Sequence, residues 1–372
     1  MKGVVGMEER RRDILPDVLK GFGAVLVVLG HCIQSGSGQT YLEDACYFED
    51  GLYQFIYSFH MPLFMIISGY YAWPGIQRAE TPEDRKKVIQ KKCVYLITPI
   101  VAWKLIEFVY MFAVGAYIYQ GFGVLLKDIS VGILTNFWFL WAILYSFLLV
   151  CLMHYRFRDS VWLYVLIFAA TFFTPDGLGL NAYKYMLPYY LIGFYVNKNR
   201  ERLLSKRLCR EIFGSGRLRT GLAVLVSGIV FLTLVSFFTA DSFIYLTGYK
   251  LIGKNYIVQL GIDIYRFLAG LCGIAFWFLV WGALLHLCGE QCRGVRLAAY
   301  LGRRGFGIYI ISGILVPYVV SPISADWAPR YDVNLAETVM VLLASIVIVD
   351  MLRRIRLICR LVGEERPEPL HK

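Results

Sequence analysis

Charged residues are scarce in this sequence. Only 17% of its 372 residues are Asp, Glu, Lys or Arg, whereas a soluble domain usually carries about 25%. Hydrophobic residues make up 58% of the chain, and they cluster in runs. Several runs reach the roughly 20 residues that a helix needs to cross a bilayer. The composition therefore argues against a water-soluble domain and indicates a membrane protein.

Other sequence features are also absent. Short segments of alternating hydrophobicity, which build membrane β-barrels, are missing, and no linker rich in Pro, Gly or Ser divides the chain. The nine cysteines are scattered and indicate no disulfide framework, and Cys288 and Cys292 lack the second pair that a zinc site needs. We therefore expect an all-α protein without a metal site, folded as a single membrane domain over residues 1–372. Its core would span about residues 12–352, followed by a short cytoplasmic tail at 353–372.

The hydrophobic runs predict a polytopic bundle of about ten transmembrane helices with both termini in the cytoplasm. Lys and Arg accumulate in the cytoplasmic loops of membrane proteins. With the N-terminus inside, 30 of the 38 Lys and Arg residues fall in cytoplasmic segments and four in outer loops. The net charge of +11 then reflects topology and contact with anionic lipid, and we expect no nucleic-acid partner. The expected spans are residues 17–34, 51–73, 93–119, 137–154, 161–174, 183–196, 220–239, 262–286, 306–320 and 337–352.

Ionisable residues inside spans are energetically costly, so they are candidates for function. In the first span, the eleven steps from Lys20 to His31 bring both residues to the same helix face, roughly 16 Å apart along the axis. Asp17 lies on the same stripe. This pattern predicts a charge pair at the cytoplasmic end and a titratable imidazole in the outer half. The alternative is that Asp17 and Lys20 only anchor the helix at the interface, with His31 as a hydrogen-bonded helix-end residue.

Two further spans carry ionisable residues. His60 lies in the second span, two residues before Pro62, which frees backbone carbonyls that a polar side chain can use. In the eighth span, Asp263 and Arg266 are three residues apart on one helix face, near the depth expected of His31. The alternative interpretations are a core histidine for His60 and a structural ion pair within the helix for Asp263 and Arg266.

These segments resemble the membrane acyltransferase-3 family. A basic residue eleven positions before a histidine is similar to the first-helix signature of that family. Residues 59–70, which begin Phe-His-Met-Pro, resemble its second-helix signature in the form typical of fucose 4-O-acetylase-like members. Residues 138–140 resemble the start of its fourth span, and residues 301–309 resemble a late segment that ends in tyrosine. The resemblance covers about residues 12–352.

The resemblance implies transfer of an acyl group, usually acetyl from cytoplasmic acetyl-CoA, to a hydroxyl of a sugar, cell-surface polysaccharide or lipid-linked glycan. A neutral imidazole, with an ordinary pKa near 6.5, can take the proton of that hydroxyl, and we assign His31 as general base. Asp263 would orient it, while Arg266 or His60 would stabilise the developing oxyanion or hold the acceptor. A covalent acyl-enzyme on His31 or on Ser68 is the alternative chemistry.

Acetyl-CoA would be a donor substrate rather than a cofactor, and basic residues near the cytoplasm would attract it. The other expected partners are membrane lipid and glycan-assembly machinery, in the plasma membrane, which is the inner membrane of a bacterium. Two positions depart from the family pattern: Ser312 replaces a frequent histidine, and Lys92 and Tyr95 replace a frequent pair of arginines. The residues assigned to substrate and donor binding are Lys20, Asp17, Lys91, Lys92, Trp138 and Tyr309.

A multi-pass transporter or exporter of a small molecule or glycan is the rival function. Buried charges and small-residue helix faces serve transporters equally well. The two halves of the chain show no matching pair of spans broken by Gly or Pro, which disfavours this function.

Overall fold

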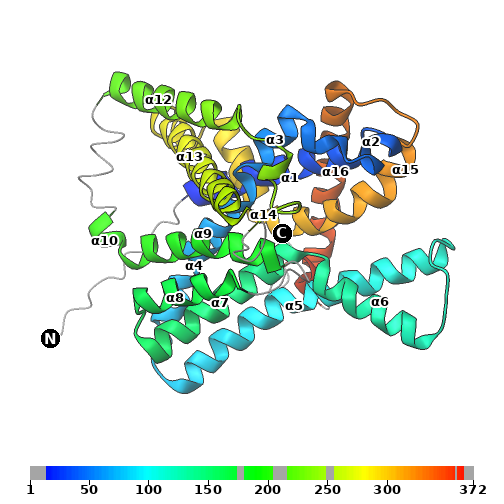
Figure 1. Cartoon of the computed structure of the whole chain (residues 1–372), viewed down its shortest axis with the longest axis horizontal. Coiled ribbons are helices and arrows are strands. Elements are labelled where there is room, and N and C mark those ends of the chain that lie inside the picture. The colour runs from blue at the N-terminus through cyan, green and yellow to red at the C-terminus, as the bar shows by residue number, and fades with distance from the viewer. Residues whose placement is uncertain (1–13, 174–179, 204–215, 249–254, 357, 364–372) are drawn as a thin grey trace.

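The computed structural model describes residues 14–173, 180–203, 216–248, 255–356 and 358–363 (Figure 1). Regular structure in these ranges is entirely helical, which confirms the all-α class. Among the residues that the structure describes, seven helices are long and apolar enough to cross a membrane, while the larger number of about ten stays a prediction. Both termini, expected in the cytoplasm, lie outside the described ranges. The seven are α1 (Leu15–Ser35), α5 (Pro82–Ala113), α7 (Trp138–Phe157), α12 (Arg217–Val235), α13 (Tyr256–Cys288), α14 (Arg293–Leu315) with its continuation to Ile323, and α16 (Tyr331–Arg354).

Each of the ten expected spans overlaps at least one helix. The two shortest expected spans correspond to α8 (Val161–Thr171) and α9 (Leu180–Lys198). The second expected span is divided into α3 (Gly51–Tyr57) and α4 (His60–Gln77). The division places Pro62 in the first turn of α4, where its missing amide hydrogen costs no hydrogen bond within the helix.

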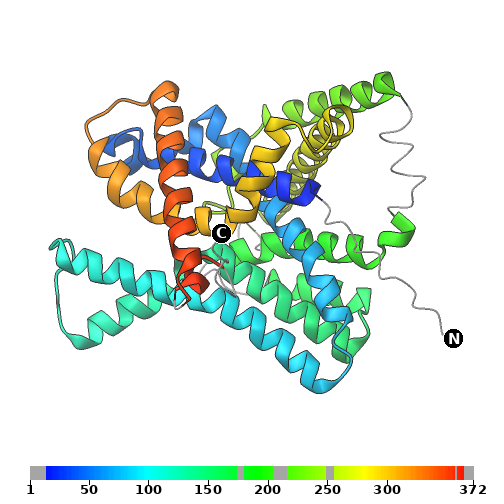
Figure 2. The ribbon, with the colours of Figure 1, turned by 180° about the vertical axis from the view of Figure 1, so that it is seen from behind.

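Residues 120–136 differ from the expectation of an outer loop, because most of them form α6 (Phe122–Thr135). This helix is shorter than the roughly 20 residues of a full span. The two views show that α6 and the end of α5 form a hairpin that projects from the other helices (Figures 1 and 2). Glu107 of α5 accepts a hydrogen bond from Asn136 Nδ2 at 3.0 Å, which ties the end of α6 to α5, and another from Lys104 Nζ of its own helix at 2.8 Å.

Two helix pairs pack with their backbones in direct contact, and glycine makes each contact. A Cβ atom added to Gly302 of α14 would lie 1.7 Å from the carbonyl oxygen of Asp17 in α1, and one added to Gly21 would meet Ala298 in the same way. Gly69 of α4 and Gly193 of α9 form a second reciprocal pair. Small residues of this kind let membrane helices approach closely. The seams hold the helix of Lys20 and the helix of His60 in fixed positions.

Candidate functional site

Five helices, α1, α4, α5, α7 and α14, enclose a cavity of about 230 Å³, which we call the long cavity. Three cationic side chains line it, Lys20, Lys92 and Arg303, each from a different helix. Lys20 pairs with Asp17 at 2.7 Å and lies 5.2 Å from the centroid of the Tyr71 ring. Grouped cations of this kind suit a ligand with several phosphate groups.

The long cavity changes from charged to apolar along α4. Tyr71, at the cationic end, and Met61 both line it, and their ten-residue separation corresponds to roughly 15 Å of helix. Around Met61 the lining is formed by Phe64, Phe139 and Tyr309. The cavity is therefore elongated, with cations at one end and aromatic and thioether groups at the other, beside His60.

His60, next to Met61 in the chain, lies near this apolar end. His60 is 2% exposed, and its Nδ1 lies 2.8 Å from the carbonyl oxygen of Ile56. A carbonyl oxygen can only accept, so Nδ1 must carry the hydrogen and Nε2 holds the lone pair of the neutral ring. The His60 ring also contacts the Tyr57 ring edge-on, with centroids 4.6 Å apart. His31 is close enough to His60 for their charges to interact.

His31 itself is half-buried on α1. Its Nδ1 atom is fully buried and has no hydrogen-bond partner among the residues that the structure describes. Buried polar atoms in native proteins are nearly always satisfied, so a water molecule or a ligand group can bond to this atom. The structure thus brings Lys20 and His31 to one helix, and His31 and His60 to one region.

Asp263 and Arg266 form a buried ion pair on α13, 4% and 1% exposed respectively. Arg266 also donates to the carbonyl oxygen of Thr247 at 3.0 Å and lies over the ring of Tyr185, 5.4 Å from its centroid. Gln259 donates to Asp263 at 3.0 Å. These contacts direct the pair towards Tyr185 and the segment before α13.

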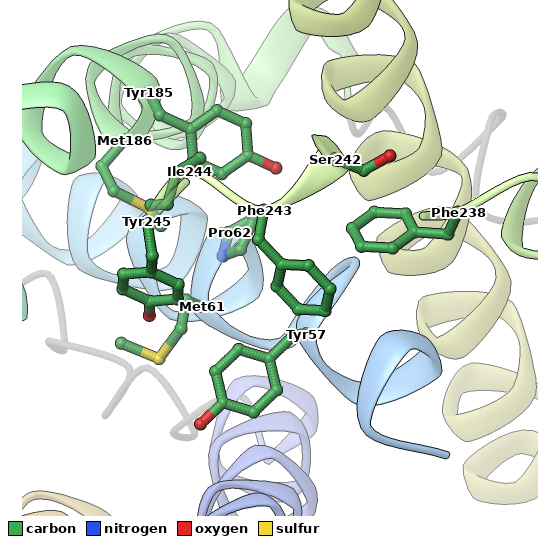
Figure 3. Close-up of a pocket in the computed structure, with 10 residues that line it drawn as sticks. All are labelled: Tyr57, Met61, Pro62, Tyr185, Met186, Phe238, Ser242, Phe243, Ile244 and Tyr245. Carbon is green, nitrogen blue, oxygen red and sulfur yellow. The ribbon is translucent and has the colours of Figure 1, made fainter. Parts of the chain in front are cut away.

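Tyr185 lines a second, smaller cavity of about 20 Å³, which we call the small cavity (Figure 3). Tyr57, the residue that contacts His60, lines it as well. Arg266 and His60 therefore each contact a residue that lines the small cavity. Trp138, at the start of α7, lies beside a third lining residue, Tyr245, with ring centroids 5.9 Å apart.

A third cavity, of about 350 Å³, lies past the end of α1 and is lined by polar side chains. Among them, Asp50 accepts hydrogen bonds from the hydroxyls of Tyr41 at 3.2 Å and Tyr331 at 2.9 Å. Burial, and then the charge of Asp50, raises the pKa of Tyr41, which keeps its hydroxyl a donor. Asn334 lines the same cavity and donates to the carbonyl oxygen of Cys32 at 3.2 Å, one residue after His31.

The remaining assigned residues are placed differently. Tyr309 lines the long cavity, and the hydroxyl of Ser312 donates to its carbonyl oxygen at 3.2 Å. Lys91 is exposed on α5 and is not among the residues that line the long cavity. The sequence analysis did not assign Arg303 or Met61 to the site, although both line the long cavity. Spacing offered a signal for Arg303, because Gly302, Phe306 and Tyr309 recur every three to four residues on the same face of α14. The described residues contain no cluster of metal-binding side chains.

A family model described as an acyltransferase domain matches residues 14–354. The chain is 32% identical over 195 residues to nodulation protein NolL of Sinorhizobium fredii, which covers 52% of this chain and 51% of that protein. It is 29% identical over 184 residues to nodulation protein NolL of Mesorhizobium japonicum, covering 49% and 47%. The chain thus matches about half the length of these curated relatives. No solved structure matches it.

Proposed function

Because the chain belongs to the acyltransferase-3 family, we propose that it is a membrane-embedded O-acetyltransferase of the plasma membrane. It transfers acetyl from cytoplasmic acetyl-CoA to a hydroxyl of a sugar, cell-surface polysaccharide or lipid-linked glycan. The observation that carries this proposal is the long cavity, which has cations at one end and Met61, the chain neighbour of His60, at the other.

The donor fits the long cavity by charge and by length. Coenzyme A carries its phosphates at one end and its thioester at the end of a flexible arm. The phosphates bind at Lys20, Lys92 and Arg303, and the arm extends along α4 towards Met61. The thioester carbonyl then lies next to Tyr309, whose hydroxyl donates to the developing oxyanion.

The reaction begins at the histidines. His31 takes the proton of the acceptor hydroxyl as its oxygen attacks the thioester carbonyl. The tetrahedral intermediate collapses, the carbon–sulfur bond breaks, and the CoA thiolate leaves and receives the proton from the imidazolium of His31. His60, whose Nδ1 is held by Ile56, presents Nε2 as an acceptor that orients the incoming hydroxyl. While neutral, His60 has no hydrogen left to offer the oxyanion, so we give that role to Tyr309.

The acceptor reaches His31 from the opposite end of α1. The third cavity lies there and offers a carboxylate, an amide and two tyrosines, groups that bind sugar hydroxyls by hydrogen bonds and by ring stacking. Arg266, paired with Asp263, lies over Tyr185, so the ion pair fixes one wall of the small cavity beyond Met61. Acetylation of an outer glycan then requires no export of CoA.

The test is transfer of radiolabel from acetyl-CoA to extracted glycans by membranes that contain the protein. His31→Ala should abolish the labelled ester while the protein still inserts, and His286→Ala, at an exposed position on α13, should not. Substantial labelling by His31→Ala would remove His31 from catalysis. Glycan flux across the membrane without any label would support the rival transport function.

A further inference from the structure

Met61 is the one residue that the lining of the long cavity shares with the lining of the small cavity. It follows His60 in the first turn of α4 and is 7% exposed. Its side chain therefore forms a boundary between the two spaces.

Different groups surround Met61 on its two sides. On the side of the long cavity lie Phe64 and Tyr309. On the other side lie Tyr57 and Tyr245, whose ring centroids are 6.4 Å apart (Figure 3). Methionine is unbranched and fills irregular gaps well, so a single thioether chain can close the opening between these rings.

The space beyond Met61 is small. The small cavity measures about 20 Å³, and a cavity of roughly 10 to 15 Å³ holds one water molecule. In the proposed binding mode the CoA arm runs along α4 towards Met61, so an acyl group whose carbonyl lies at Tyr309 extends towards Met61. A methyl group fits there, whereas additional methylene groups would have to displace the thioether.

We propose that Met61 sets the acyl-chain length, closing the inner end of the long cavity so that acetyl-CoA is accepted and longer acyl-CoA thioesters are rejected. The inference rests on the proposed function, since it places the acyl-CoA in the long cavity. Met61→Ala joins the two cavities and should admit longer chains.

The experiment measures the dissociation constants of CoA, acetyl-CoA and hexanoyl-CoA for the purified full chain in detergent. The wild-type protein should bind hexanoyl-CoA at least tenfold more weakly than acetyl-CoA, a difference typical of a few excess methylenes in a closed pocket. Met61→Ala should bring the two values within about twofold. Met61→Val, which disturbs packing less, should shift the ratio in the same direction.

Met65→Ala is the matched control. Met65 lies one turn further along α4, is fully buried and lines neither cavity, so its truncation should leave the preference for acetyl unchanged. If the Met61 variants keep the wild-type preference while CoA still binds, the role of Met61 is refuted and the proposed function stands. If the wild-type protein binds none of the three compounds, the donor site itself is refuted.

Discussion

Gly302→Ala tests whether the seam between α1 and α14 positions the cationic end of the long cavity. The added Cβ would lie 1.7 Å from the carbonyl oxygen of Asp17, whereas real Cβ contacts are essentially never shorter than 3.0 Å. The backbone oxygen cannot rotate away as a side chain would, so the two helices must separate by roughly 1 Å or more.

The displacement acts on the site directly. Arg303 follows Gly302 on α14, and Asp17 holds Lys20 by their ion pair. Separating the helices moves both cations relative to Lys92 on α5. A misplacement of about 1 Å at a binding site can cost about 100-fold in rate, and overpacking typically costs about 1–3 kcal/mol of stability. We therefore expect a 10- to 100-fold loss of kcat/KM for acetyl-CoA together with a lower Tm.

Gly294→Ala is the control, because it places the same methyl group on the same helix with nothing within 4 Å. Initial rates of acetyl transfer and thermal unfolding in detergent would be measured for both variants. If Gly302→Ala matches Gly294→Ala in rate and in Tm, the seam does not position the site.

Two further predictions concern charged side chains. Arg303→Ala and Lys92→Ala should each raise the KM for acetyl-CoA about tenfold, a loss in the range of one charge-assisted hydrogen bond. The effect should weaken as salt screens the charges, which kinetics at two ionic strengths would show. An unchanged KM in both variants would place the CoA phosphates elsewhere. Asp159→Asn should lower the unfolding free energy by about 3 kcal/mol and leave the KM for acetyl-CoA unchanged. The reason is that this buried carboxylate binds His154 at 2.6 Å and also Lys198. Thermal unfolding that matches the wild type would contradict this prediction.

The parts of the site that follow from one helix were predictable from the sequence. The 3.6-residue period places Lys20 and His31 on one face. The proline at position 62 predicted unpaired carbonyls near the start of this helix. His60 bonds to the carbonyl of Ile56, whereas the carbonyl that Pro62 itself leaves without a main-chain amide is that of Ser58. Both inferences need only the geometry of a single helix and the hydrogen-bonding capacity of its residues.

The parts that depend on several helices were not predictable in this way. Met61 stands between His60 and Pro62, but its place between two cavities results from the packing of α4 against other helices. The depth of Asp263 could be estimated from its position in the span, but the rotation of α13 about its axis could not. The helix at Phe122–Thr135 was missed because its length and its charged pair, Lys127 and Asp128, are poor signals for a span.

The break between α3 and α4 gives His60 two duties that a simple deletion would confuse. In an unbroken helix the carbonyl of Ile56 would bond to the main-chain amide of residue 60, and here the imidazole of that residue takes the amide's place. Truncation to alanine would therefore leave the Ile56 carbonyl with only the long hydrogen bond from the Phe59 amide, at 3.4 Å, as well as removing the ring. Asparagine, whose side-chain amide can still donate to that carbonyl but cannot accept a proton at neutral pH, would preserve the local backbone and isolate the chemical duty.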